Sequence, residues 1–578
     1  MGEGLSWRRA AGAGATVIGA AAVTAALLKF FGDSTTTWDD AEVSKPRGAP
    51  GKEAAHSASA GTAAGASAAG AATGAGASEA EAAALARGLT KVGEGSELMP
   101  DYVAGLCKIA ARAAASATGC GYIDNFGQVI LLVTRPEHAR KILSRNVGHD
   151  LGGMKPASAA YFGDQVLFIL EGKEWRRLRN MMRHALLPQA LPRMAADVTA
   201  TAFALGRKLE QIVGDSKTTS LDMHFVASMY HLSATGRSAF GYDLGCLEDI
   251  AKGPNAITES FEYLLSELPR RAYSQDPAIR EDYASDTPDN REWRRHAQNV
   301  RVEINRVVQA RIKFRNEGGR RPPDLLESMI QSYESEQGEE GGHVASAEEL
   351  MENLGDNIIE LFFAGYNTVA AAVGTAMHFL SRDRSLQGRV QQEAEAALDD
   401  VVAGGTIDLN KLPLCEAVFM EALRVAGPVP LVYRITDGPT DLGPGCTLPA
   451  GTIWIPAEHI HKDPKTWGAD AAEFRPDRWL ENDGQPPVPG SFLAFSLGPR
   501  ECIGRHFARL EAVSALAVLC KYFSFRAKPD FKFAPTFTGF GVRPFDGNSN
   551  RVCVDCLVER RVTAETLFDW SWPSSVAA

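Results

Sequence analysis

Apolar and polar positions divide the chain into an uncharged N-terminal stretch, a long run of small residues and a globular part. The uncharged stretch reaches from Ala10 to Leu28, and Ala, Gly and Ser dominate residues 43–88. Such small residues cannot bury a core and predict a flexible linker. From these shifts we predict the following segments: a membrane anchor or targeting segment at 1–31, a linker at 32–97, a folded domain at 98–562 and a C-terminal tail at 563–578.

Inside the globular part, the spacing of apolar residues predicts a mainly α-helical fold with a small β portion. Residues 127–133 form an apolar run typical of a strand. Pro136–Leu143 begins with proline, which is favoured in the first turn of a helix. The pattern is mainly helical from 173 to 425. Short strands, Gly and Pro follow, until a last long helix near 503–522.

Two uncharged stretches are long enough to raise the question of a membrane span. At Ala10–Leu28 a membrane anchor, a cleaved targeting peptide and a disordered tail all fit the composition. Residues 361–377 carry no charge either, but Tyr366, Asn367 and Thr368 interrupt them. Because acidic residues also precede this stretch at helical spacing, we interpret it as the central buried helix of a large domain.

Composition and charge exclude several classes of protein. The net charge of -11 is opposite in sign to the footprint of a nucleic-acid-binding protein. The cysteines are scattered and odd in number, which indicates reduced thiols and no secreted disulfide framework. Cys553 and Cys556 form a C-x-x-C pattern, but they alternate with apolar residues as in a strand, so we predict ordinary core positions for both.

One cysteine, Cys502, stands in a segment with the properties of a thiolate–metal site. The segment runs from Phe495 to Gly504 and reads Phe-Ser-Leu-Gly-Pro-Arg-Glu-Cys-Ile-Gly. Gly498 and Gly504 would let the backbone approach a flat cofactor closely. Arg500 would pair with a carboxylate of that cofactor. The N-terminus of the following helix would stabilise a thiolate.

This segment resembles the haem-binding loop of the cytochrome P450 family, F-x-x-G-x-R-x-C-x-G, without a mismatch. The uncharged N-terminal stretch is similar to that of the eukaryotic, membrane-associated type. The resemblance implies a cytochrome P450-like fold, with the haem between the central helix and the Cys loop. It also implies haem b (iron protoporphyrin IX) as the cofactor and Cys502 as the thiolate ligand of its iron.

Two further segments resemble parts of the family that support the haem loop. Glu421 and Arg424 match its E-x-x-R helix, and residues 474–479, which include Arg478, match its F-x-P-x-R-W segment. In the family the glutamate and both arginines form a buried network. The resemblance therefore implies structural roles for Glu421, Arg424 and Arg478.

Other residues resemble those that bind the haem propionates. Trp175 and Arg179 stand one helical turn apart and match the W-x-x-x-R pattern of the family's propionate-binding helix. Arg434 lies where many members have a further arginine. The resemblance thus implies these cofactor-binding residues: Trp175, Arg179, Arg434, Phe495, Arg500 and Gly504.

The central helix matches the oxygen-binding segment of the family, A/G-G-x-D/E-T-T/S, only in part. The resemblance implies catalytic roles for Gly365, which would leave space over the iron, and for Thr368, which would hydrogen-bond to the bound oxygen or its water. Asn367 replaces the usual acid, which normally helps to relay protons. An amide does not titrate but can order a water, so we expect altered proton delivery.

The resemblance implies an oxidoreductase, a haem-thiolate monooxygenase that inserts one oxygen atom from O2 into a lipophilic small molecule. The sequence contains no G-x-G-x-x-G or flavin module, so electrons would come from a separate NADPH–cytochrome P450 reductase or a ferredoxin. Two alternatives stay open. The first is a haem-thiolate isomerase, lyase or peroxygenase that acts on a hydroperoxide, and the second is a non-catalytic haem-binding protein. The unaltered haem loop favours the monooxygenase.

The substrate is expected to be lipophilic. Substrate contacts in the family come from variable segments, which fall near 145–170 and 220–300 in this chain. Phe362, Phe363 and Ala364 predict an apolar pocket beside the haem. Fatty acids, sterols, terpenoids and carotenoids all remain open.

Membrane association is expected from the N-terminal stretch. Anchored members of the family face the cytosol from the endoplasmic reticulum, which is the first expectation here. Arg8 and Arg9 precede the stretch and match that orientation poorly. A plastid or another organelle is therefore the alternative location.

Overall fold

The computed structural model describes residues 83–561 with short gaps. These gaps are at 85–86, 99–100, 126–127, 146–147, 149–153, 215, 217, 273–278, 280–281, 320–323, 339–343, 402–404 and 539–540. The predicted anchor at 1–31 and the predicted tail at 563–578 lie outside the described residues.

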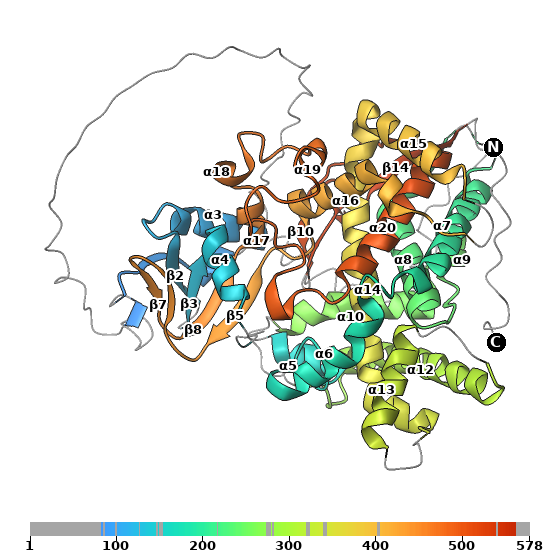
Figure 1. Cartoon of the computed structure of the whole chain (residues 1–578), viewed down its shortest axis with the longest axis horizontal. Coiled ribbons are helices and arrows are strands. Elements are labelled where there is room, and N and C mark those ends of the chain that lie inside the picture. Colours follow the sequence, from blue (N-terminus) through green and yellow to red (C-terminus); the bar gives the residue numbers. More distant parts are fainter. Residues whose placement is uncertain are drawn as a thin grey trace, which may run out of the picture.

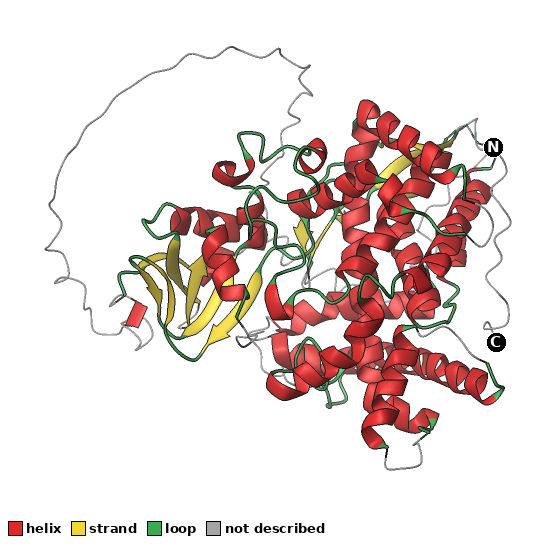
Figure 2. Ribbon diagram, viewed as in Figure 1, coloured by secondary structure: helices red, strands yellow, loops and turns green. Residues whose placement is uncertain are grey.

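Helices make up most of the described chain, as the apolar spacing predicts (Figure 2). The longer helices are α3 (Tyr102–Ala114), α4 (Pro136–Leu143), α5 (Met154–Phe162), α6 (Gly172–Leu186), α7 (Pro192–Val213), α8 (Met223–Ala239), α10 (Ala256–Ala272), α12 (Pro288–Asn316), α13 (Leu325–Gln337), α14 (Ala347–Arg382), α15 (Arg384–Leu398), α16 (Pro413–Ala426) and α20 (Arg505–Tyr522). The short ones are α9 (Cys246–Lys252), α17 (Ala457–His461), α18 (Pro464–Trp467) and α19 (Asp477–Leu480), with 3-10 turns η2 (Gly95–Leu98), η3 (Leu409–Lys411) and η4 (Gly498–Arg500).

The main sheet lies to one side of the large helical body, together with α3, α4 and α17 (Figure 1). Its strand order is β1-β2-β3-β8-β5, with β3 parallel to β8 and both β2–β3 and β8–β5 antiparallel. The strands of this sheet are β1 (Thr90–Glu94), β2 (Cys120–Asn125), β3 (Gln128–Val133), β5 (Val432–Thr436) and β8 (Gly451–Ile455).

The other strands form smaller sheets. One has the order β4-β14-β9, and three hairpins pair β6 with β7, β10 with β11 and β12 with β13. These strands are β4 (Thr219–Asp222), β6 (Thr440–Gly443), β7 (Cys446–Leu448), β9 (Phe523–Ala527), β10 (Thr536–Phe537), β11 (Val542–Arg543), β12 (Phe545–Asp546), β13 (Arg551–Val552) and β14 (Asp555–Arg560). The C-x-x-C cysteines Cys553 and Cys556 are both fully buried in the core, as predicted.

Strand β1 lies inside the segment 32–97 that the composition predicts as a linker. It pairs in parallel with β2, and Leu89 and Val92 are buried in the apolar clusters on the sheet. The predicted boundary at residue 97 is therefore too late. The reason is that the run of small residues ends before Leu89, where large apolar side chains resume at spacings that a strand can bury.

Helix α14 is the central element of the helical body. It begins at the N-cap residue Ser346, whose hydroxyl accepts the Glu349 backbone N–H over 3.2 Å. Its N-terminal half packs in one large apolar cluster and its C-terminal half in the other. In the described part of the chain it is the one helix long and apolar enough to cross a membrane, but 78% of that window is buried inside the protein. The uncharged stretch 361–377 is therefore a core helix, as predicted.

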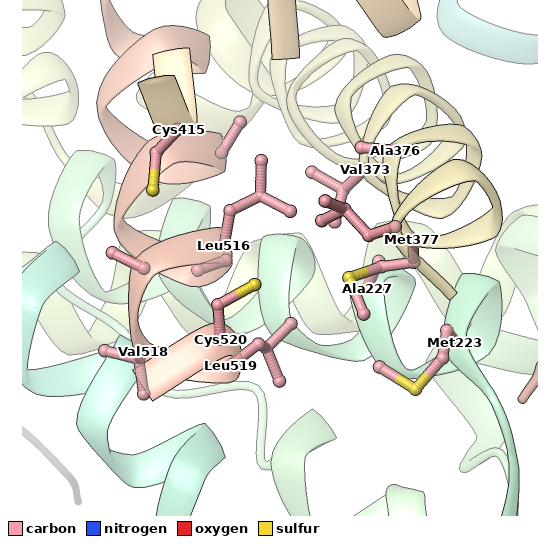
Figure 3. Packing of buried hydrophobic residues seen from close by; sticks show 14 of the residues in the cluster. Met223, Ala227, Val373, Ala376, Met377, Cys415, Leu516, Val518, Leu519 and Cys520 are labelled. Atoms are coloured by element: carbon pink, nitrogen blue, oxygen red, sulfur yellow. The ribbon is translucent and has the colours of Figure 1, made fainter. Parts of the chain in front are cut away.

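The C-terminal half of α14 packs against both α8 and α20. Val373, Ala376 and Met377 interdigitate with side chains of α8 and α20, so three helices share one apolar core (Figure 3). Small residues on α14 allow the neighbouring helices to approach it closely, and Leu516 of α20 fills the space between α20 and α14. This core fixes α14 relative to α20, the helix that follows Cys502.

Candidate active site

The Cys loop, residues 495–504, is a closed turn that contains η4 and leads into α20. The backbone N–H of Cys502 donates to the carbonyl of Phe495 over 2.8 Å, which ties the two ends of the loop together. Gly498 has a φ of 74°, and a Cβ placed there would collide with the carbonyl oxygen of Leu143 at the end of α4. Only glycine meets both conditions, so this position is fixed by the close contact with α4.

The thiol of Cys502 has donors and positive charges around it. The backbone N–H of Gly504 donates to its sulfur, although α20 begins at Arg505, a little later than the sequence indicates. Cys502 borders a cavity, but the surrounding protein desolvates the thiol and raises its pKa; the Gly504 donor and the charges of Arg179 and Arg505 act in the opposite direction. A bound metal ion would remove the proton outright, because a coordinating thiol is deprotonated.

Three arginines from separate segments gather beside the Cys loop. Arg500 belongs to the loop itself, Arg179 to α6 and Arg434 to β5. The guanidinium of Arg500 lies 4.5 Å from the centroid of the Trp175 ring, and that of Arg179 lies 5.6 Å from it. Arg500 also donates to the carbonyl of Leu170 over 3.0 Å. The structure thus brings together most of the residues predicted to bind a cofactor.

These arginines form no ion pair with the residues that the structure describes. Arg434 is 2% exposed and donates to the carbonyl of Tyr433 and the hydroxyl of Ser496. Burial lowers the pKa of Arg434 to about 10, with a further contribution from the charge of Arg500. Burial also lowers the pKa of Arg179 and of Arg500, whose Nε is buried without a partner in the described structure. Three cations in this state fit a ligand that carries carboxylates.

A cavity of about 250 Å³ lies between α6 and the Cys loop. It is lined by residues of both elements: Arg179, Arg183, Leu186, Leu187, Gly498, Pro499, Glu501, Cys502, Ile503, Arg505 and His506. Cys502 and Arg179, which the sequence places more than 300 positions apart, therefore face the same space.

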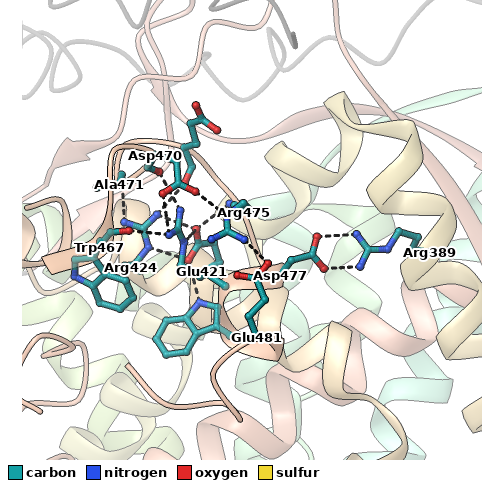
Figure 4. Close-up of polar contacts among 12 residues, drawn as sticks. Arg389, Glu421, Arg424, Trp467, Asp470, Ala471, Arg475, Asp477 and Glu481 are labelled. Carbon is teal, nitrogen blue, oxygen red and sulfur yellow. Dashed lines mark hydrogen bonds and ion pairs between the residues drawn. The ribbon is translucent and has the colours of Figure 1, made fainter. Parts of the chain in front are cut away.

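Glu421 is the centre of a buried polar network behind the loop (Figure 4). Its carboxylate accepts from Arg424 through two N–H groups at 2.8 Å and from Arg478 at 2.9 Å. The indole of Trp479 and the backbone N–H of Arg475 also donate to it, at 2.9 and 2.8 Å. Glu421 and Arg424 are fully buried and Arg478 is 7% exposed, so each charge depends on its partners.

The network also reaches the approach to the Cys loop. Arg424 donates to the backbone carbonyls of His461 and Ala471 at 2.7 and 2.6 Å. The imidazole Nε2 of His461 in turn accepts the backbone N–H of Leu493 over 2.7 Å. Leu493 stands two residues before Phe495. A chain of hydrogen bonds therefore connects Glu421 with the segment that enters the loop.

One face of α14 is accessible at mid-length. Ala364 is exposed and Leu361 and Thr368 are half-buried, while Phe362 and Phe363 beside them are buried. Leu361, Ala364 and Thr368 share one helical face, because three and four positions separate consecutive members of this set. A buried helix with an open strip at mid-length has room for a flat ligand on that strip.

Comparisons with known proteins agree with this geometry. The cytochrome P450 family model matches residues 123–545. The chain belongs to the cytochrome P450 family. It is 28% identical to Cytochrome P450 72A11 of Arabidopsis thaliana over 65% of this chain and 70% of that protein. It is 27% identical to pentalenene oxygenase of Streptomyces avermitilis over 69% and 82%, and 31% identical to 7-deoxyloganic acid hydroxylase of Catharanthus roseus over 45% and 50%.

Haem is therefore the cofactor of this P450, and the enzyme is an oxidoreductase of the monooxygenase class. The residues present fit the group. Cys502 would supply a thiolate with a backbone donor beside it, and the arginines without ion pairs would supply cations for the propionates. The plant relatives agree with the prediction of the eukaryotic type.

Gly365 of the P450 is half-buried and packs against α8, while its predicted role of leaving space over the iron stays a prediction. A Cβ at this position would lie 2.9 Å from the hydroxyl oxygen of Thr235 on α8. That hydroxyl donates to the buried carboxyl of Glu511 on α20 over 3.2 Å. Gly365 therefore permits close packing of α14 on α8, and Ala364 holds the open position. The sequence could not separate the two residues because both are small.

Gly365→Ala should destabilise the P450 by about 1–3 kcal/mol, since the added methyl group has to displace Thr235 or separate two packed helices. Gly388→Ala on α15 is the matched control, because no atom lies within 4 Å of a Cβ built there. This control should be neutral or stabilise by up to about 1 kcal/mol, the usual helix-propensity difference. Urea unfolding of both variants measures the two effects. Equal midpoints for the two variants would contradict the packing role.

Phe362 and Phe363 are core residues, which corrects the prediction of a pocket lined by them. The ring of Phe362 stacks on Phe240 with centroids 4.3 Å apart. The ring of Phe363 packs edge-on against Phe162 of α5 at 5.0 Å. Both are at most 1% exposed. Ala364 alone of the predicted triplet reaches open space.

Asn367 is 2% exposed, and its carbonyl oxygen has no hydrogen-bond partner in the described structure. A buried amide oxygen without a partner is costly unless a water or a ligand satisfies it. Thr368, its neighbour, donates its hydroxyl proton to the carbonyl of Ala364 over 3.1 Å. Asn367 therefore has the free acceptor that an ordered water requires.

Glu360 is a buried group of α14 that the sequence reasoning did not select. Its two carboxyl oxygens accept the backbone N–H groups of Leu167 and Phe168, at 2.9 and 2.7 Å. These residues lie in the loop between α5 and α6, inside the segment 145–170. Because the partners are backbone groups, no side-chain pattern in the sequence indicates the pair. Burial raises the pKa of Glu360 to about 7.

This pKa predicts a specific dependence of stability on pH. The folded-state pKa exceeds the ordinary glutamate value of 4.5, so the native state binds more protons between the two values and stability falls as pH rises from 4.5 to about 7. Glu360→Gln should lose one hydrogen bond at every pH but remove this decline. The stability difference between wild type and variant, measured by urea unfolding at a series of pH values, should therefore shift in favour of the variant as pH rises. A difference that stays constant would speak against the buried, proton-binding carboxyl.

Proposed function

We propose that this P450 hydroxylates a lipophilic small molecule, using O2 and electrons from a separate NADPH–cytochrome P450 reductase or a ferredoxin. The observation that carries the proposal is the pairing of a complete thiolate loop with an open strip on α14. That strip consists of Leu361, Ala364 and Thr368, so it offers a mostly apolar surface with one hydroxyl that would face a bound cofactor. Such a surface suits an apolar substrate held by few polar contacts.

When bound, the haem supplies an iron that activates dioxygen, and the protein residues hold it in place. Cys502 would ligate the iron, and the Gly504 N–H would temper the charge of the sulfur. Arg179, Arg434 and Arg500 would bind the propionates. Trp175 holds two of these arginines by stacking against their guanidinium groups.

Proton delivery on the α14 side rests on Thr368 and Asn367. The Thr368 hydroxyl would hold a proton on the open strip and could be resupplied by a water. The unpartnered Asn367 oxygen is the acceptor that orders that water. Because an amide cannot supply the proton itself, we expect slower delivery than with an acid at this position.

A second candidate function follows from Asn367. An enzyme that rearranges or uses a hydroperoxide takes its oxygen already reduced and does not need a proton relay, so an amide at this position would be harmless. The Cys loop of this chain matches the family pattern without a change, which supports the monooxygenase.

The two functions separate in one experiment. The purified haem enzyme is incubated with a set of lipophilic substrates, NADPH, a P450 reductase and O2, and in parallel with a lipid hydroperoxide alone. We expect NADPH-dependent oxygen consumption and a hydroxylated product. Turnover of the hydroperoxide alone, with no oxygen consumed in the other arm, would replace the proposal by the second function.

Location is part of the proposal. We place the enzyme on a membrane, with the endoplasmic reticulum first and a plastid or other organelle second, because the uncharged stretch Ala10–Leu28 and a lipophilic substrate both favour a lipid surface. Fractionation of cells that express the full chain, compared with a chain lacking residues 1–31, tests this. Equal recovery of both in the soluble fraction would count against it.

A further inference from the structure

A second group of metal-ligating side chains lies outside the haem site. Cys120 begins β2, His138 lies in α4, and Cys446 begins β7 in the hairpin that β6 and β7 form. All three are buried, with 1%, 8% and 4% of their surface exposed. They come from segments far apart in the sequence and meet in the apolar cluster of the main sheet.

The three ligand atoms have the spacing of a tetrahedral metal site. The two sulfur atoms are 3.5 Å apart, and the sulfur of Cys120 is 3.7 Å from Nδ1 of His138. All three ligand atoms lie within 4.8 Å of one another. Bonds of about 2.3 Å to sulfur and about 2.0 Å to nitrogen at tetrahedral angles place two sulfurs about 3.8 Å apart and a sulfur and a nitrogen about 3.5 Å apart. The two measured separations lie within about 0.3 Å of these values.

We infer that Cys120, His138 and Cys446 bind a divalent metal ion of the zinc class, with a water at the fourth position. Two thiolates and one imidazole are ligands that zinc prefers over harder cations. A disulfide between the cysteines would use only two of the three groups and would leave the imidazole beside them without a role.

Polar groups surround the ligand atoms. The Thr118 hydroxyl is hydrogen-bonded to Cys446, and the positive charge of Arg135 acts on both thiols.

This group cannot be the iron site of the haem. A haem iron has four in-plane positions filled by the porphyrin and two axial positions on opposite faces. Three side chains whose ligand atoms all lie within 4.8 Å of one another cannot occupy such positions. The metal at this group is therefore additional to the haem and does not depend on the proposed function.

Metal binding here would steady the Cys loop from a distance. His138 stands near the start of α4, and Leu143 at its end contacts Gly498 of the Cys loop so closely that a Cβ would collide. A metal ion at the group would tie α4 to β2 and to the hairpin of β7. We therefore assign His138 a positioning role for the loop, exerted through α4.

The full-length haem protein, purified after growth with added zinc, provides the test. Zinc and iron are measured by mass spectrometry, and X-ray absorption at the zinc edge reports the ligands without interference from haem. We expect one zinc per haem, with two sulfur ligands and one nitrogen ligand. Cys446→Ala and His138→Gln should each lower the zinc content about tenfold or more, because each removes a ligand.

Cys556→Ala is the matched control, since Cys556 is equally buried but lies in the apolar core of the helical body, which α8, α14 and α20 share. It should leave the zinc content unchanged. Haem protein without zinc, or zinc that Cys446→Ala and Cys556→Ala reduce equally, would overturn the inference. A Cys120–Cys446 disulfide found by non-reducing peptide mapping would overturn it too. The X-ray absorption spectrum of the wild-type protein identifies the zinc ligands directly, so it tests the inference even if a variant fails to fold.

Discussion

Cys502→Ser should abolish O2-dependent hydroxylation and leave a folded protein. Serine has the size of cysteine, so the Cys loop keeps its closing bond from the backbone N–H of residue 502 to Phe495. Its hydroxyl does not ionise, however, and cannot donate the electron density with which a thiolate favours O–O cleavage. We expect turnover below detection with NADPH and reductase, and a circular dichroism spectrum like that of the wild type.

Cys107→Ser is the control for Cys502→Ser. Cys107 is half-buried in α3, away from the Cys loop, and the substitution makes the same chemical change. It should retain the wild-type rate of product formation. Hydroxylation that persists in Cys502→Ser at the rate of Cys107→Ser would remove Cys502 from the active site.

Glu421→Gln should lower the free energy of unfolding by about 3–5 kcal/mol, the usual cost of breaking a buried charge network. Glutamine has the shape of glutamate, but its amide NH2 group is itself a donor. It would therefore face N–H groups whose hydrogen bonds the Glu421 carboxylate now accepts. Arg424 would then be a buried cation without an anion, and Arg478 would keep only its longer contact with Asp470, at 3.4 Å. Because the network connects through His461 to the start of the Cys loop, we also expect haem to dissociate faster.

Glu473→Gln is the matched control in the same region, since the side chain of Glu473 is exposed. It should change the stability by less than about 0.5 kcal/mol. Thermal unfolding and the rate of haem transfer to apomyoglobin measure both variants. Similar behaviour of the two would show that the Glu421 network does not hold the fold.

The Cys-loop side of the site could be predicted from the sequence, because its patterns depend on residue spacing within single segments. Arg500, Cys502 and Gly504 occupy one loop, and Glu421 and Arg424 share one helical turn. Local patterns of this kind survive folding unchanged. The structure adds why Gly498 is required, which is its contact with Leu143 of α4. No local pattern contains that partner.

The α14 side was only partly predictable, because orientation about a helix axis depends on its neighbours. Ala364 and Gly365 are both small, and the sequence does not say which of them faces the cofactor. The structure turns Gly365 toward Thr235 of α8 and leaves Ala364 open. Phe362 and Phe363 illustrate the same point, since aromatic side chains that could line a pocket stack in the core instead.

Groups that pair with backbone atoms, or across long sequence separations, could not be found from the sequence. Glu360 binds two backbone N–H groups of a loop nearly two hundred residues away. Cys120 and Cys446 are separated by 326 positions. Neither pair leaves a motif, so only the folded chain reveals them.

The ferrous–CO absorption spectrum of the purified protein tests the assignment of Cys502 as the haem ligand most directly. A strongly red-shifted haem band marks thiolate ligation. We predict this band for the wild type and for Cys107→Ser, and its complete loss in Cys502→Ser even where haem is retained. Persistence of the red-shifted band in Cys502→Ser would contradict the assignment of the iron ligand and, with it, the site built around the Cys loop.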